Sequence, residues 1–86
     1  MWTILFTKQA EKDKSLLKQA KLDNKAKNLL NIMAVDPFHV PPSYEKLVGD
    51  LNGYYSRRIN FQHRIVYRVD KEKRVVIVHA MWTHYE

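Results

Sequence analysis

The fold is decided by residues 54–70, YYSRRINFQHRIVYRVD. β-Branched and aromatic side chains are frequent on both sides of the central Asn60-Phe61-Gln62, which predicts strands over residues 54–59 and 64–70 joined by a tight turn around Phe61. Two strands joined by so short a turn must be antiparallel. This stretch therefore predicts a β-hairpin, and the rest of the chain must pack against it.

A short strand and two helices are predicted before the hairpin. Residues 2–6 are aromatic and β-branched, and Thr7 can cap the helix that follows. Asp23 can cap a second helix, and Asp36-Pro37 ends it, because the residue before a proline is driven out of helical geometry. The second helix carries its apolar side chains at the spacing of one buried face: Ala26, Leu29, Leu30 and Met33.

A third strand is predicted after the hairpin, over residues 74–82, beyond the charged tip DKEK. The order of elements is then β-α-α-β-β-β. It predicts a single domain over residues 1–86 of the α+β class, with an N-terminal strand and a helical hairpin packed on one face of a mainly antiparallel sheet. The side chains expected to face the helices from the hairpin are Tyr55, Ile59, Ile65, Tyr67 and Val69.

The charge of the chain is unevenly distributed. Fifteen Lys and Arg residues outweigh nine Asp and Glu residues among 86, and there is no cysteine, which excludes a disulfide scaffold and thiolate metal sites. All five arginines lie between residues 57 and 74, whereas seven of the ten lysines precede residue 28. Because the planar guanidinium suits phosphate better than an ammonium does, the second half of the chain is predicted to handle an anion.

The hairpin register predicts where that anion would bind. With the turn centred on Phe61, Arg58 lies directly opposite Arg64, and Tyr54 lies opposite Arg68 on the same face. Like charges at opposed positions destabilise a sheet. Three arginines beside a tyrosine are typical of a phosphodiester site, with cations for the developing charge and a ring for a base. A solvated face whose arginines find carboxylate partners remains the alternative.

Acid–base groups are scarce. His84, near the end of the chain, is either part of a frayed terminus or a general acid. An odd number of residues in the loop before the last strand would place His84 on the face of Arg64, and an even number would not. Glu45 is either a solvated carboxylate or a base. The other histidines have no metal-ligand spacing, so any catalysis is predicted to be acid–base chemistry without a metal or cofactor.

The chain resembles a known family over about half of its length. The matching residues are Glu45-Lys46-Leu47, LNGYYSRRI at 51–59, HRIVY at 63–67, and the terminal His84-Tyr85. This pattern resembles the Txe/YoeB toxins, which belong to the RelE superfamily of bacterial toxin–antitoxin systems. The chain departs from it at Val48, where the family commonly has a lysine, and by the additional Glu86.

The resemblance implies a ribosome-dependent endoribonuclease that cleaves mRNA in the ribosomal A site and halts translation. Glu45 would be the general base for the ribose 2′-hydroxyl, and His84 the general acid for the departing 5′-oxygen. Arg64 would stabilise charge on the scissile phosphate with help from Arg58, and Tyr85 would hold the nucleotide. Two further side chains are expected to contact the substrate: Lys46 and Arg68.

The resemblance also implies partners and a location. They are mRNA on the 70S ribosome, a YefM/Axe-type antitoxin, and operator DNA only through the antitoxin complex, all in the bacterial cytoplasm with no membrane. Whether the toxin alone is a monomer or a homodimer stays open. Two other functions also stay open: a non-catalytic ribosome- or RNA-binding module, and a decayed toxin that only binds its antitoxin.

Overall fold

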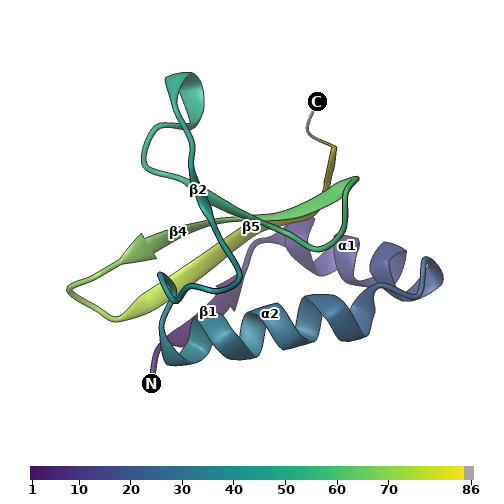
Figure 1. Ribbon diagram of the computed structural model, residues 1–86, viewed down its shortest axis with the longest axis horizontal. Coiled ribbons are helices and arrows are strands. Elements are labelled where there is room, and N and C mark those ends of the chain that lie inside the picture. The colour runs from purple at the N-terminus through teal and green to yellow at the C-terminus, as the bar shows by residue number, and fades with distance from the viewer. Residues whose placement is uncertain (85–86) are drawn as a thin grey trace.

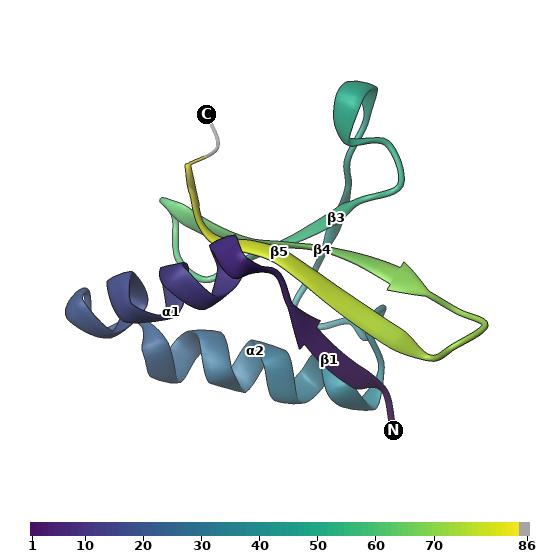
Figure 2. The same cartoon turned by 180° about the vertical axis from the view of Figure 1, so that it is seen from behind.

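The computed structural model describes the backbone of residues 1–84 and the side chains of residues 1–82. Five strands, two helices and a short 3-10 helix follow one another along the chain (Figures 1 and 2). They are β1 (Thr3–Phe6), α1 (Lys8–Gln19), α2 (Asp23–Val35), β2 (Glu45–Lys46), η1 (Gly49–Leu51), β3 (Tyr55–Arg58), β4 (His63–Asp70) and β5 (Val75–His84). Neither helix is long and apolar enough to cross a membrane.

The strands form one sheet in the order β1-β5-β4-β3-β2. β1 runs parallel to β5, and the other neighbours are antiparallel. Both helices lie on the same side of this sheet, and the segment from β2 to β3 rises from the other side (Figures 1 and 2). The predicted α+β class, element order and mainly antiparallel sheet are therefore confirmed. The two-residue edge strand β2 was not predicted.

The hydrophobic core lies between the helices and the sheet. Helices α1 and α2 turn their small and aliphatic faces onto the central strands, and the sheet supplies alternate residues of β4 and β5. The buried cluster is Ala10, Leu17, Ala26, Leu29, Met33, Ile59, Ile65, Tyr67, Val76, Val78 and Met81. The predicted core face of the hairpin is confirmed, because Ile59, Ile65 and Tyr67 are buried and Tyr55 and Val69 pack against this cluster.

Helix α1 begins as its sequence predicts. The Oγ1 atom of Thr7 accepts a hydrogen bond from the Ala10 amide at 3.2 Å, which satisfies one of the free N–H groups of the first turn. The same hydroxyl donates to the carbonyl of His79 at 2.8 Å, so the cap also ties the helix to β5.

The predicted cap of α2 was wrong. Asp23 is the first residue of that helix, and its N-cap is Leu22, which makes no side-chain cap bond. The reason is the short connection, since only residues 20–22 separate the helices. Lys21 reverses the chain with a positive φ of 60°, and the Leu22 amide donates to the carbonyl of Leu17 at 2.8 Å. Helix α2 therefore begins directly after Leu22. It ends at Val35, as the predicted stop at Asp36-Pro37 requires.

The strand ends differ slightly from the prediction. Tyr54 lies outside β3 because its amide donates to the carbonyl of Leu51 at 3.0 Å rather than to the sheet. Arg74 lies outside β5, since its φ of 55° is not that of a strand. β4 is longer than predicted because it begins at His63. β5 is longer than predicted because it continues to His84. The predicted pairing of Arg58 with Arg64 is confirmed.

Candidate active site

The face of the sheet turned away from the helices brings together four polar side chains. Glu45 of β2 pairs with Ser56 of β3, and Arg58 of β3 pairs with Arg64 of β4. Because alternate residues of a strand point to the same face, these side chains share the face opposite to Ile65. Together with Pro42 and Ser43 they line a small pocket of about 90 Å³. The register of two short ladders thus assembles a carboxylate, a hydroxyl and two guanidinium groups.

An ion pair is the centre of this pocket. The NH1 group of Arg64 lies 3.0 Å from Oε2 of Glu45, and it donates a hydrogen bond to Oγ of Ser56 at 3.1 Å. The Arg64 side chain is only 10% exposed, whereas that of Glu45 is 59% exposed. The Arg64 guanidinium is therefore held in place by the buried Ser56, while the Glu45 carboxylate is largely open to solvent. Arg58, which is exposed, adds a second cation directly opposite the first.

The end of β5 reaches this pocket through an irregular ladder. The pairing of β4 with β5 shifts register twice, on either side of Val66. As a result Thr83 lies opposite Arg64, and the backbone of His84 pairs with His63. The loop of residues 71–74 has an even number of residues, for which we predicted that His84 would not lie opposite Arg64. The backbone pairing agrees, because Thr83 occupies that position. Tyr85 lies outside the described residues.

A buried carboxylate holds the irregular part of β5 in place. Oδ2 of Asp13 accepts the Met81 amide at 2.9 Å, and Oδ1 accepts a hydrogen bond from Gln9 at 2.9 Å. Asp13 is 2% exposed. A register shift leaves backbone groups outside the ladder, and here an acceptor from α1 satisfies the amide next to the shift. Helix α1 therefore positions the last residues of β5 beside Arg64.

The structure separates two of the predicted substrate contacts from the pocket. Lys46 pairs with Tyr55, so it lies on the opposite face from Glu45, where it lines a pocket with Phe38, Tyr44 and Lys71. Arg68 is exposed and lines another depression, which it shares with Tyr54 and residues 69–72. The three arginines predicted for one site thus divide into a close pair and a separate Arg68.

Arg57 is a structural residue, although it lies in the arginine-rich second half of the chain that was predicted to handle an anion. It is 1% exposed and faces the side opposite to Arg58. Its guanidinium donates to the carbonyls of Pro37, His39 and Pro42 at 2.9, 2.8 and 2.7 Å, and to the hydroxyl of Tyr67 at 3.2 Å. Arg57 therefore ties the connector between α2 and β2 to the sheet.

Comparison with known proteins places this arrangement in a family. The family model described as "YoeB-like toxin of bacterial type II toxin-antitoxin system" matches residues 6–85. The chain belongs to this toxin family. It is 42% identical to Toxin YoeB of Streptomyces coelicolor over 76% of this chain and 75% of the relative. The resemblance on residues 45–67 and 84–85 is thereby confirmed as a family relationship.

Solved structures of YoeB toxins have the same fold. A YoeB/ParE toxin from Agrobacterium tumefaciens aligns with a TM-score of 0.86 at 30% identity, covering 96% of this chain and 99% of that one. YoeB of Staphylococcus aureus, in a heterotetrameric complex with YefM, aligns with a TM-score of 0.81 at 34% identity over 99% of both chains. The chain is accordingly a YoeB-type toxin of a toxin–antitoxin system.

The sequence analysis missed one residue of the candidate site, Ser56, and one residue that supports it, Asp13. Ser56 could have been found from its parity with Arg58, since residues two apart in a strand share a face. Asp13 offered no such signal, because a carboxylate in the first turns of a helix is ordinarily explained by the helix dipole. Its partner, Met81, lies 68 residues away in the chain, and only the folded structure shows the contact.

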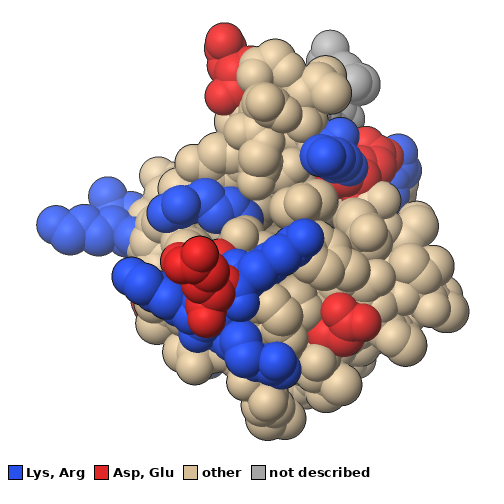
Figure 3. Space-filling model, turned by 90° about the vertical axis from the view of Figure 1, so that its left-hand side faces the viewer, with Lys and Arg blue, Asp and Glu red and all other residues tan. Residues whose placement is uncertain are grey.

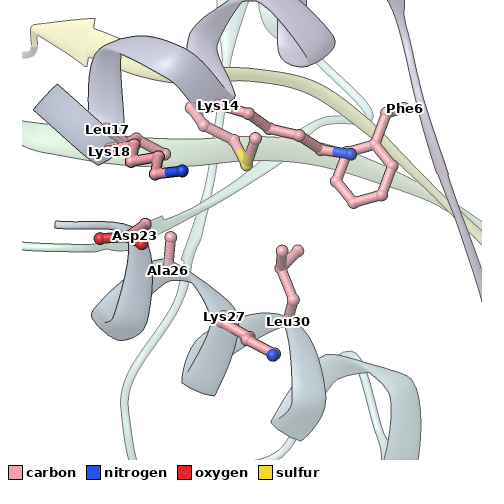
Figure 4. A pocket seen from close by; sticks show the side chains of 9 residues that line it. Phe6, Lys14, Leu17, Lys18, Asp23, Ala26, Lys27 and Leu30 are labelled. Carbon is pink, nitrogen blue, oxygen red and sulfur yellow. The ribbon is translucent and has the colours of Figure 1, made fainter.

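A larger apolar groove lies on the helical side of this toxin, away from Glu45. Its walls come from α1, α2, the end of β1 and Met81, with a volume of about 350 Å³ (Figure 4). Lys14, Lys18 and Lys27 stand around it, and the Lys14 ammonium lies 3.8 Å from the centre of the Phe6 ring. The groove contains no acid–base pair of the kind that Glu45 and Arg64 form.

A partly buried histidine and a buried tyrosine have altered acidity. Burial lowers the pKa of the His79 imidazole below its usual value, and the positive charge of Arg68 lowers it further. Burial raises the pKa of the Tyr67 phenol, an effect that Arg57 partly offsets. Neither group reaches the Glu45 pocket. Among the side chains of residues 1–82, no cluster of three His, Asp or Glu residues is placed to hold a metal ion.

Proposed function

We propose that this protein is a ribosome-dependent endoribonuclease that cuts mRNA in the ribosomal A site by metal-free acid–base chemistry. The observation that carries the proposal is the Glu45–Arg64 ion pair, which joins an exposed carboxylate to a nearly buried guanidinium at 3.0 Å. Ser56 and Arg58 complete the pocket, and the backbone of β5 ends beside it. The Glu45 carboxylate, the two guanidinium groups and the backbone of His84 lie at one end of the sheet, which supports the proposed roles of base, phosphate-binding cations and acid.

The proposed reaction uses a nucleophile that RNA itself supplies. Glu45 accepts the proton of the ribose 2′-hydroxyl as that oxygen attacks the neighbouring phosphorus. Arg64 and Arg58 stabilise the additional negative charge on the phosphate oxygens. The bond from phosphorus to the 5′-oxygen breaks, and His84 donates a proton to that oxygen. The products are a 2′,3′-cyclic phosphate and a 5′-hydroxyl, while Tyr85 holds the nucleotide.

The partners follow from the same proposal. The Staphylococcus aureus YoeB is known both as a dimer and as a heterotetramer with YefM. We therefore expect this toxin to bind a YefM-type antitoxin that blocks the pocket, and to bind operator DNA only through that antitoxin. A basic surface with a net charge of +6 suits an acidic inhibitor and the ribosome alike, and we expect the toxin to act in the bacterial cytoplasm.

A cell-free translation assay tests this proposal. Cleavage of a ribosome-bound mRNA is followed by primer extension with the wild type, with Glu45→Gln and with His84→Ala. General acid–base groups contribute about 10²–10⁴-fold, so each variant should lose at least 100-fold in rate. Glu11→Gln is the matched control, because Glu11 is also exposed and ion-paired, to Lys14 at 3.0 Å on α1. It should cut at the rate of the wild type.

The outcomes separate the alternatives. A wild type that leaves ribosome-bound mRNA intact rules out the nuclease and leaves a binding module or a decayed toxin. Glu45→Gln and His84→Ala variants that still cut would show that the acid–base roles are wrong. A 2′-deoxy nucleotide at the cleavage position should block the reaction of the wild type, since it removes the attacking oxygen.

A further inference from the structure

A second pocket lies on the helical side of the same edge strand. It is lined by three aromatic rings and two ammonium groups: Phe38, Tyr44, Tyr55, Lys46 and Lys71. Its volume is about 420 Å³, within the range of roughly 300–1,000 Å³ that small-ligand sites occupy. None of the residues that line it belongs to the Glu45 pocket. Aromatic rings with adjacent cations are the combination that binds single-stranded nucleic acid.

The rings form a preorganised surface. Phe38 lies with its ring centre 5.6 Å from that of Tyr44 and 5.2 Å from that of Tyr55. The buried Arg57 holds the connector that carries Phe38, and its guanidinium lies 5.3 Å from the centre of the Tyr44 ring. A surface that is already fixed loses little conformational entropy when a ligand binds.

The Phe38 ring is accessible from solvent. Phe38, Tyr44 and Tyr55 are all only partly buried, and the exposed Lys71 places its ammonium 5.4 Å from the centre of the Phe38 ring. A hydrated cation at this position means that the ring is open to solvent there. A nucleobase can take this place by stacking, and the flexible lysine can then turn to the adjoining phosphate.

The two lysines of the pocket have no carboxylate partner among the described side chains. Within residues 1–82 the ion pairs are Glu11–Lys14 and Glu45–Arg64, so neither Lys46 nor Lys71 has a carboxylate partner there. Figure 3 looks onto the end of the molecule formed by the β4–β5 loop, where basic side chains surround a few acidic ones. The exposed cations of that loop and its flank are Arg68, Lys71, Lys73 and Arg74.

The edge position of β2 connects the two pockets. Glu45 and Lys46 are consecutive residues whose side chains lie on opposite faces of the sheet. β2 is the edge strand of the sheet. An RNA strand bound at Glu45 therefore needs to cross only β2 to reach Lys46 on the other face. An RNA strand can therefore bend around this edge and occupy both pockets.

We propose that the pocket of Phe38, Tyr44, Tyr55, Lys46 and Lys71 is a second RNA-binding site, which stacks one unpaired base and binds its phosphate through the two lysines. The inference rests on RNA being the substrate class of the proposed function. It does not require cleavage, and its test uses RNA that cannot be cut.

The test measures binding of a fluorescein-labelled 2′-O-methyl RNA hexamer that carries one 2-aminopurine. The wild type should raise the anisotropy and quench the 2-aminopurine, since stacking quenches it. Phe38→Leu removes the ring but keeps an apolar side chain, and it should weaken binding about 5- to 100-fold and abolish the quenching. Lys46→Ala/Lys71→Ala should make the salt slope of log K shallower by about 0.7, because the two lysines together bind one phosphate.

Lys25→Ala/Lys27→Ala is the matched control, because it removes the same charge from exposed residues of α2. It should leave the quenching and the salt slope unchanged. The inference is wrong if Phe38→Leu binds within twofold of the wild type, or if the two double variants weaken binding equally. Since Lys46 and Lys71 are exposed, their replacement gives a result even where Phe38→Leu unfolds. A wild type that binds as expected but cuts no mRNA keeps the second site and refutes only the nuclease.

Discussion

Arg57 and Arg58 are neighbours of the same type that we expect to have opposite roles. Arg57 is 1% exposed and gives four hydrogen bonds to the connector and to Tyr67. Arg58 is exposed and faces Arg64 in the Glu45 pocket. Arg57→Met should therefore destabilise the fold, whereas Arg58→Met should leave stability nearly unchanged and slow mRNA cleavage.

The size of the effect follows from the contacts of Arg57. Hydrogen bonds to a charged group contribute about 1.5–3 kcal/mol each, so four give roughly 6–12 kcal/mol. Burial of the guanidinium offsets several kcal/mol of this. A net loss of about 3–5 kcal/mol remains for Arg57→Met, in a domain of this length whose total stability is roughly 4–13 kcal/mol. Arg58→Met should change stability by less than about 0.5 kcal/mol.

Urea unfolding followed by tryptophan fluorescence measures the difference. With an m-value of about 1 kcal/mol/M, the midpoint of Arg57→Met should fall by about 3 M or more. Arg57→Lys should also unfold early, because one ammonium cannot replace a fork that donates to four oxygens. Midpoints of Arg57→Met and Arg58→Met within about 0.5 M of one another would contradict the structural role of Arg57.

Three other variants test the supports of the site. Asp13→Ala should lose about 1–3 kcal/mol of unfolding free energy, because the buried Met81 amide loses its acceptor. It should also slow cleavage by releasing the end of β5, whereas Asp13→Asn should keep both the stability and the rate. Urea unfolding measures the first effect and the translation assay the second. Thr7→Ala should lose about 1–2 kcal/mol in the same unfolding assay, since the hydroxyl caps α1 and bonds His79, while Thr7→Ser should keep the stability. His79 has a lowered pKa in the folded state, so the unfolded state binds more protons as the pH falls through about 6.5, and the stability decreases there. His79→Phe should therefore lose less stability than the wild type between pH 7.5 and pH 5.5, and equal losses would mean that His79 has no part in the acid sensitivity.

The hairpin could be predicted because its signals are local. Alternation of side chains and a tight turn fix the pairing of Arg58 with Arg64, and the Thr7 cap and the Asp36-Pro37 stop depend only on neighbours in sequence. Most of the family residues of the second half were likewise visible, because residues 45–47, 51–59 and 63–67 lie close together in the sequence. The short strand β2 could not be predicted, since two residues show no alternation.

The supports of the site depend on contacts between distant residues. Nothing in the sequence distinguishes Arg57 from Arg58 except parity, and parity alone does not show that three carbonyls of the connector surround one of them. Asp13 and Met81 are 68 residues apart and meet where α1 packs against β5, next to the register shifts. Lys46 follows Glu45 directly, yet its side chain lies on the other face because β2 is extended.

The core and the candidate active site are therefore specified by the same alternation in β3. Tyr55 and Arg57 point toward the connector and the core, while Ser56 and Arg58 point toward Glu45 and Arg64. A slip of one residue would exchange the two sets. It would bury the side chains of Ser56 and Arg58 against apolar neighbours and leave the carbonyls around Arg57 without their donor. The requirements of the buried face thus fix the register, and the register places the cations of the exposed face where a phosphate can bind.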